Sequence, residues 1–178
     1  MKKYSVVIAV LLISVISMAL FLLVLGFRVN ITDSIPVGLY RITGIKNLKN
    51  SFVIFCPDNR FAFKQGMERG YIASGFCAGG YGVLMKKIVA VSSDQISVTS
   101  DGVFINHKRL PYSTPKLRDR ANRLLPQWHV LHYRLKEDEL LSMTNQNELS
   151  FDSRYYGPIR IGQVKGVITP VWVFGKKL

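Results

Sequence analysis

The chain has 178 residues and carries 24 Lys or Arg against 11 Asp or Glu, which gives a formal net charge of +13. Hydrophobic residues make up 48% of the sequence, which excludes an intrinsically disordered chain, because disorder requires low hydrophobicity. Two cysteines are too few for a small disulfide-rich scaffold, and the length is that of a single domain.

A stretch without any charged residue lies near the N-terminus, from Ser5 to Phe27. A helix of about 20 apolar residues crosses a hydrocarbon core of about 30 Å, so residues 5–27 are predicted to form a transmembrane anchor after a tail of residues 1–4. A cleavable signal peptide is the alternative, but its apolar region is shorter, at about 7–15 residues, and the sequence LGFRVN is a poor cleavage site.

The charges around this anchor predict its orientation. Lys2 and Lys3 precede it and Arg28 follows it, and the larger basic side of an anchor usually stays in the cytoplasm. Residues 28–178 are then expected on the opposite side. Cys56 and Cys77 both lie in this exported part, where they can form a disulfide that contributes roughly 3 kcal/mol. Neither has a second Cys or a His at zinc-like spacing, so no metal site is expected.

The excess of positive charge favours an anionic partner. The basic residues are scattered, and no zinc-finger, helix-turn-helix or RNP-like pattern accompanies them, so nucleic acid is not expected. A domain held against anionic membrane lipid is the favoured interpretation.

Short segments rich in β-branched and aromatic residues follow the anchor, with turn residues between them. No helical pattern separates these segments, whereas the strands of a parallel sheet usually alternate with helices. The sequence therefore predicts a mainly β, antiparallel domain. Leu135–Met143 remains open between a helical turn and a strand. The expected strands are Ser51–Cys56, Gly82–Val91, Gln95–Thr99, Gly102–Asn106, Trp128–Tyr133 and Val164–Val173.

Three patches could carry chemistry, and the first surrounds Ser34 in the segment Thr32–Tyr40. Ser34 follows Phe27 by seven residues, and an extended chain covers at most about 3.3–3.6 Å per residue. Ser34 is therefore expected within about 25 Å of the end of the anchor. Taken alone, its Ser-x-Pro-x-Gly pattern indicates only a turn.

The second patch is a pair of lysines, Lys86 and Lys87, within an apolar strand. Alternation places them on opposite faces, and a lysine that is desolvated loses pKa and can act as a general base. Alternation does not choose between the two lysines. From periodicity alone, two solvated lysines on a sheet edge are the favoured interpretation.

The third patch is the segment Ser150–Pro158. If this segment is extended, Ser150, Asp152 and Arg154 share one face, near enough to hydrogen-bond to one another. The alternative is a surface turn with a weak ion pair.

Together the three patches resemble the type I signal peptidases, and most of all the conjugative-transfer, TraF-type branch that matures pilin subunits. The sequence departs from the family where Ala90–Asp94 replaces a Gly-x-Pro-Gly-Asp turn and where Asn50-Ser51 replaces Gly-Asp. The motifs that carry the resemblance are Thr32-x-Ser34-x-Pro36-x-Gly38-Leu39-Tyr40, Phe55-Cys56-Pro57, Arg69-Gly70-Tyr71 with Gly75-x-Cys77, Lys86-Lys87-x-Val89-Ala90, and Ser150-Phe151-Asp152-Ser153-Arg154-Tyr155-Tyr156-Gly157-Pro158.

The resemblance implies a Ser/Lys pair in an antiparallel β catalytic domain of signal-peptidase/LexA-like type. Ser34 is then the nucleophile. Lys86 is the general base, because the family's lysine is followed at once by a second basic residue. The backbone N–H of Ser34 and the hydroxyl of Thr32 are expected to stabilise the oxyanion.

The resemblance also assigns supporting roles in the third patch. Ser150 matches the serine that orients the lysine, and Asp152 and Arg154 match positions that hold the site together. No cofactor is implied.

The implied function is a serine endopeptidase of the bacterial inner membrane, with a cytoplasmic N-terminus and a periplasmic catalytic domain. Its expected substrates are exported precursors, such as pilin or another conjugative-transfer protein. The sequence leaves open the cleavage site, whether the product is linear or cyclised, and the oligomeric state.

Two other functions are weaker alternatives. A Ser-His-Asp hydrolase could use His107, His129 or His132, but no Gly-x-Ser-x-Gly elbow surrounds any serine. A membrane-anchored basic module of a conjugation or secretion assembly would need no catalytic residues at all.

Overall fold

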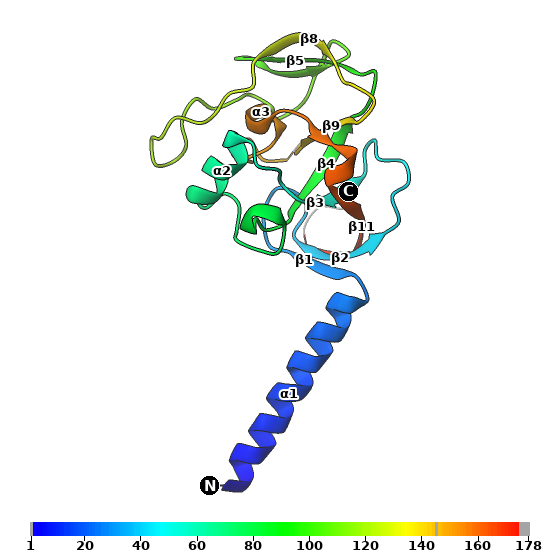
Figure 1. Cartoon of the computed structure of the whole chain (residues 1–178), viewed down its shortest axis with the longest axis vertical. Coiled ribbons are helices and arrows are strands. Elements are labelled where there is room, and N and C mark those ends of the chain that lie inside the picture. Colours follow the sequence, from blue (N-terminus) through cyan, green and yellow to red (C-terminus); the bar gives the residue numbers. More distant parts are fainter. Residues whose placement is uncertain (1, 145, 175–178) are drawn as a thin grey trace.

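The computed structural model of the chain describes residues 2–144 and 146–174. Met1, at the start of the predicted tail, and residues 175–178, at the end of the predicted domain, lie outside the described residues. A single long helix projects from one end of a β domain, and the strands nearest to it are β1 and β2 (Figure 1).

The long helix, α1, covers Lys2–Val24 and is long and apolar enough to cross a membrane. Its segment Tyr4–Val24 has a mean hydropathy of 3.1, and none of it is buried against the domain. The helix ends before Phe27, where the anchor was expected to end, because Gly26 adopts a φ of 85° and turns the chain into the first strand. Arg28 donates a hydrogen bond to the carbonyl of Leu23, which satisfies one of the free carbonyls at the helix end.

Two antiparallel sheets form the domain, as the sequence predicted. The larger sheet has the order β1-β2-β11-β3-β4-β9-β10, and the smaller has the order β7-β6-β5-β8. The larger sheet comprises β1 (Phe27–Asn30), β2 (Gly38–Thr43), β3 (Phe52–Phe55), β4 (Leu84–Ala90), β9 (Glu139–Met143), β10 (Ile159–Arg160) and β11 (Val164–Val173). The smaller comprises β5 (Gln95–Thr99), β6 (Gly102–Ile105), β7 (Lys108–Arg109) and β8 (Val130–Arg134).

Short helices lie in the connections between strands of the larger sheet. They are α2 (Phe61–Glu68), α3 (Ser153–Tyr156) and the 3₁₀ turns Ala78–Gly80 and Ile161–Gln163. Phe63 of α2 and Tyr156 of α3 pack with ring centroids 4.5 Å apart, in a core that also contains Phe55 of β3. A second core, around Val98 and Leu141, joins the smaller sheet to β4 and β9.

Each of the six expected strands has a counterpart, with ends shifted by a few residues. The open segment Leu135–Met143 contains β9, which is a strand and not a helical turn. The favoured interpretation of Lys86 and Lys87 as a solvated sheet edge is wrong, because β4 lies inside the sheet between β3 and β9.

Cys56 and Cys77 form a disulfide, as expected. The bond connects the end of β3 to the chain that follows α2, and it closes a loop with a sequence separation of 21 residues. Gly70, Tyr71 and Ala73, within this loop, line the groove described below. The disulfide therefore constrains one wall of that groove.

Replacement of both cysteines by Ala is expected to destabilise the domain by roughly 3 kcal/mol, because the unfolded chain regains the freedom that the cross-link removed. Thermal unfolding followed by circular dichroism measures the loss as a lower Tm. Reduction of the wild-type protein should give the same shift and should leave the double variant unaffected. Equal Tm values for oxidised and reduced protein would contradict this.

Candidate active site

The connection between β1 and β2 carries Ser34, and a buried asparagine holds this connection in place. Asn30, at the end of β1, donates from its side-chain amide to the carbonyls of Thr32 and Ile35, at 2.7 and 2.9 Å. Its side-chain oxygen accepts from the backbone N–H and the hydroxyl of Thr32. The loop is thus fixed from inside on either side of Ser34.

Two residues of the Ser-x-Pro-x-Gly-x-Tyr pattern fix where the loop returns to the sheet. The buried hydroxyl of Tyr40 donates to the carbonyl of Pro36 at 2.6 Å. A Cβ at Gly38 would lie 2.2 Å from the carbonyl oxygen of Trp172, so only glycine allows β2 and β11 to approach so closely here. The residues of this pattern therefore hold the Ser34 loop against the sheet, in addition to forming a turn.

Lys86 of β4 points inward and meets Ser34. Only 3% of the residue is exposed to solvent. The amine Nζ lies 2.6 Å from Ser34 Oγ and 2.6 Å from Ser150 Oγ, and the two hydroxyl oxygens are 3.3 Å apart. Lys87 points to the other face, where its amine lies 5.9 Å from the centre of the Phe52 ring. Alternation left open which of the two lysines points inward, and in the structure it is Lys86.

Burial lowers the pKa of Lys86 to about 8, because the charged ammonium loses its hydration. Asp152 partly opposes this shift by its negative charge, and Arg154 adds to it. Near pH 8 a large fraction of Lys86 is therefore a neutral amine with a free lone pair beside the Ser34 hydroxyl.

A buried ion pair holds Ser150 in position. Arg154 and Asp152 are both fully buried, with Nε 2.8 Å from Oδ1 and Nη2 2.9 Å from Oδ2. The same guanidinium donates to the backbone carbonyls of Ser150, Glu148 and Tyr112, at 3.0, 3.1 and 3.0 Å. Arg154 therefore fixes the backbone on which Ser150, the second partner of Lys86, is carried.

The third patch is not an extended strand with three residues on one face. Asp152 caps a helical turn, α3, by accepting from the backbone N–H of Arg154 at 3.2 Å. The Asp152–Arg154 pair is also not a weak surface pair, because no part of it is exposed. Ser150, Asp152 and Arg154 lie close together because Asp152 caps the helical turn and the Arg154 guanidinium points inward, not because the three side chains alternate along a strand.

A groove of about 590 Å³ runs past these side chains, and we call it the active-site groove. Its lining residues close to the catalytic candidates are Thr32, Asp33, Ser34, Lys86, Ser150 and Phe151. Its other apolar lining residues are Val29, Ile31, Ala73, Val83, Leu84, Met85 and Leu149. A groove open to solvent with an apolar lining is suited to an extended peptide.

Other candidates from the sequence lie differently. Thr32 lines the groove, but its hydroxyl donates to Asn30 Oδ1 at 2.8 Å. His107 lies in the turn between β6 and β7 and His132 lies on β8, with ring centroids 6.4 Å apart. Within residues 2–144 and 146–174, the hydroxyl of Ser34 has Lys86 and Ser150 as its hydrogen-bond partners and no histidine.

Sequence reasoning missed Asn30, and it assigned no role to Tyr71, which it named only as part of the Arg69-Gly70-Tyr71 motif. Asn30 organises the Ser34 loop, and its only local signal is a polar residue at the end of a strand. Tyr71 lines the groove and donates to Asp119, a contact between segments 48 residues apart that no local pattern indicates.

The sequence profile of the signal peptidase, peptidase S26, family matches residues 2–173 of the chain. The chain therefore belongs to this peptidase family.

Several relatives are plasmid or conjugal transfer proteins. The chain is 46% identical over 146 residues to the plasmid transfer protein TraF of Escherichia coli, and the match covers 82% of each protein. It is 29% identical to the conjugal transfer protein TraF of Agrobacterium fabrum, with 84% of each covered. A solved signal peptidase I from Enterococcus faecalis covers 71% of this chain and 100% of its own, at 16% identity and a TM-score of 0.41.

The buried ion pair makes a stability prediction. Asp152→Asn leaves the Arg154 guanidinium buried without its counter-charge, and breaking a buried pair in this way typically costs about 3–5 kcal/mol. Urea unfolding measures the loss. The matched control is Glu148→Gln, which removes a half-exposed partner of Lys116 and should cost less than about 1 kcal/mol. Equal losses for the two variants would contradict the assigned role of Asp152.

Proposed function

We propose that the chain is a serine endopeptidase in which Ser34 is the nucleophile and Lys86 the general base. The observation that carries this proposal is the 2.6 Å separation of Lys86 Nζ from Ser34 Oγ at a site where the amine is buried. A serine hydroxyl is a weak nucleophile until a neighbouring base takes its proton, and a neutral lysine can be that base.

The steps follow from these contacts. Ser34 Oγ attacks the scissile carbonyl carbon while its proton passes to Lys86 Nζ. The resulting ammonium then gives a proton to the leaving amine as the peptide C–N bond breaks. The acyl group stays on Ser34 until a second nucleophile releases it. Ser150 accepts a hydrogen bond from Lys86 at 2.6 Å, which keeps the amine directed at Ser34.

The oxyanion requires hydrogen-bond donors near Ser34. The backbone N–H of Ser34 is one candidate, because within the described part of the chain no protein acceptor is recorded for it. Thr32 is the second candidate, but its hydroxyl must first leave Asn30 Oδ1 by rotation about χ1. The loss of one such donor typically lowers the rate by about 10²–10³.

The proposed substrates are precursor polypeptides exported by a conjugative-transfer system, with pilin as the main candidate. The support is the identity to plasmid and conjugal transfer proteins together with a groove able to hold an extended peptide.

We place the catalytic domain on the periplasmic side of the bacterial inner membrane and in contact with anionic lipid. The charges that flank α1 support this orientation. Ile31, Trp172 and Phe174 are exposed apolar side chains on or next to β1 and β11. Arg28 and Arg41, on paired strands of the same region, add positive charge that anionic headgroups attract.

Lys86→Met and Ser34→Ala are each expected to lower the rate of cleavage by about 10³-fold or more, because each removes one member of the proposed Ser/Lys pair. The matched control is Lys87→Met, which changes the neighbouring lysine on the other face and should keep activity within a few-fold. Purified full-length variants are incubated with the candidate prepilin, and mass spectrometry measures the cleaved product. Cleavage by the Lys86→Met variant at the wild-type rate would contradict the proposal. Conjugative plasmid transfer by cells that carry Ser34→Ala would favour a non-enzymatic module.

A further inference from the structure

A second cavity continues the active-site groove beneath the long loop between β7 and β8. Its volume is about 570 Å³, and we call it the basic pocket. A peptide that lies beside Ser34 can therefore extend into it. Residues that line both cavities are Thr32, Asp33, Gly70, Tyr71, Asn147, Leu149 and Phe151.

Charge distinguishes the basic pocket from the groove. Four basic side chains line it, against two acidic ones, Asp33 and Asp119. The lining of the groove is largely apolar, and its one basic side chain is the buried Lys86. The four basic residues of the pocket are Lys116, Arg118, Arg120 and Arg123.

The four cations are not equally available to a ligand. Lys116 Nζ is 2.8 Å from Glu148, and Arg123 Nε is 2.7 Å from Asp119. Arg118 donates to the carbonyl of Asn122 at 2.7 Å. Arg120 is exposed and, across the described residues, has no recorded hydrogen bond or ion pair. It is therefore the cation most free to bind an anion.

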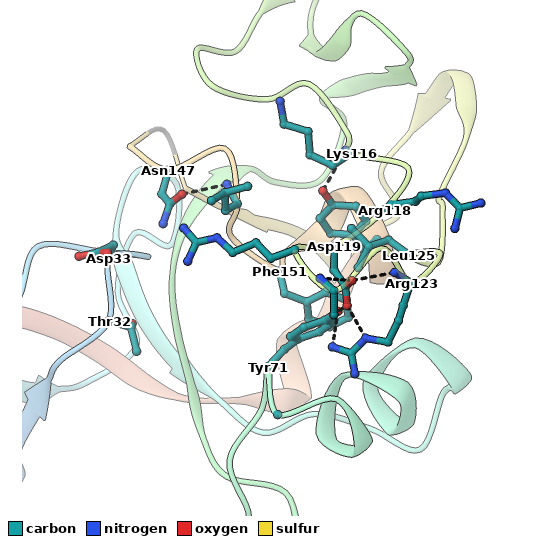
Figure 2. Close-up of a pocket in the computed structure, with 15 residues that line it drawn as sticks. Thr32, Asp33, Tyr71, Lys116, Arg118, Asp119, Arg123, Leu125, Asn147 and Phe151 are labelled. Atoms are coloured by element: carbon teal, nitrogen blue, oxygen red, sulfur yellow. Dashed lines mark hydrogen bonds and ion pairs between the residues drawn. The ribbon is translucent and has the colours of Figure 1, made fainter.

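The loop that carries Arg120 is already ordered. Asp119 accepts from the backbone N–H groups of Ala121 and Arg123, at 2.9 and 2.8 Å, and from the hydroxyl of Tyr71. The hydrogen bond from Tyr71, with those from Arg123, holds the pKa of Asp119 well below its usual range. Figure 2 shows this linked group on the opposite side of the pocket from Thr32 and Asp33. An ordered loop loses little conformational freedom when a ligand binds.

We propose that the basic pocket is a substrate subsite that binds a carboxylate of the peptide close to the scissile bond, with Arg120 as its main contact. This inference rests on the proposed endopeptidase function. The carboxylate is an Asp or Glu side chain or the free C-terminus of the peptide. An arginine presents planar donors that match a carboxylate, and at an exposed site such a pair is expected to raise affinity about fivefold.

The test uses full-length protein in a neutral detergent and short internally quenched peptides with small residues before the cut and both ends capped. Glu or Gln is placed at one position at a time on both sides of the cut. At one position, or two adjacent ones, Glu should raise kcat/KM about fivefold over Gln. About 1 M NaCl should remove the difference, because salt screens exposed charges. A Gln peptide with a free C-terminus tests the other source of the carboxylate.

Arg120→Gln should bring the Glu-to-Gln ratio close to one. The matched control is Lys108→Gln, which changes an exposed lysine of β7 outside both cavities and should keep the ratio. A ratio near one in the wild-type protein for every position and for the free C-terminus would overturn the subsite. A preference that persists in Arg120→Gln would overturn the role of Arg120.

A binding measurement separates this inference from the proposed function. Ser34→Ala protein is titrated with the same peptides carrying a fluorophore, and anisotropy gives the Kd for the Glu and Gln forms without turnover. Tighter binding of the Glu form with no cleavage by wild-type protein would support the subsite and contradict the endopeptidase. Cleavage by the wild-type protein with equal Kd values for the Glu and Gln forms would support the endopeptidase and contradict the subsite.

Discussion

The amine of Lys86 is almost fully removed from water, and the rest of the site is arranged around that constraint. Desolvation makes the charged ammonium unfavourable and lowers the pKa of Lys86 to about 8, so that the amine can lose its proton near physiological pH. The buried amine depends on the hydroxyls of Ser34 and Ser150 for its hydrogen bonds. The two hydroxyls come from opposite ends of the sequence. Each must be held by its own support, because a displaced partner would leave a buried amine without a hydrogen bond.

The fold provides those supports separately. Ser34 is carried by the β1–β2 connection, which Asn30 fixes from within and which begins only a few residues after α1. Ser150 is carried by the chain before α3, which the Asp152–Arg154 pair fixes. Lys86 comes from β4, which is paired on both sides within the larger sheet, by β3 and β9. The proposed nucleophile thus lies a few residues after an apolar helix and the proposed base is held within a sheet, an arrangement that suits a peptidase working close to a bilayer.

The sequence allowed much of this to be predicted, and the failures have a common cause. The order and spacing of motifs, through the family resemblance, predict Ser34 and Lys86 as the catalytic pair, and the structure brings the two side chains together. The β-branched and aromatic runs predict six strands, each of which has a counterpart. Alternation could not choose between Lys86 and Lys87, because both faces of β4 carry buried apolar residues and the choice depends on which face meets the segments that carry Ser34 and Ser150. Arg154 was expected on an extended face, but a cap by Asp152 bends the chain into a helical turn. In the sequence Arg120 is one of several charged residues in a polar loop. Its position beside the groove depends on tertiary packing, which the local sequence does not indicate.

The pKa of Lys86 tests the account most directly. Full-length protein in detergent micelles, labelled with ¹³C at the lysine Cε, is titrated by NMR, and Lys86→Met identifies the resonance. The account predicts that this one lysine titrates near pH 8, neutral above it and protonated below it, while an exposed lysine titrates near its usual value of about 10.4. A Lys86 resonance that titrates with the exposed lysines would show that the amine is charged at neutral pH and would contradict its role as the base for Ser34.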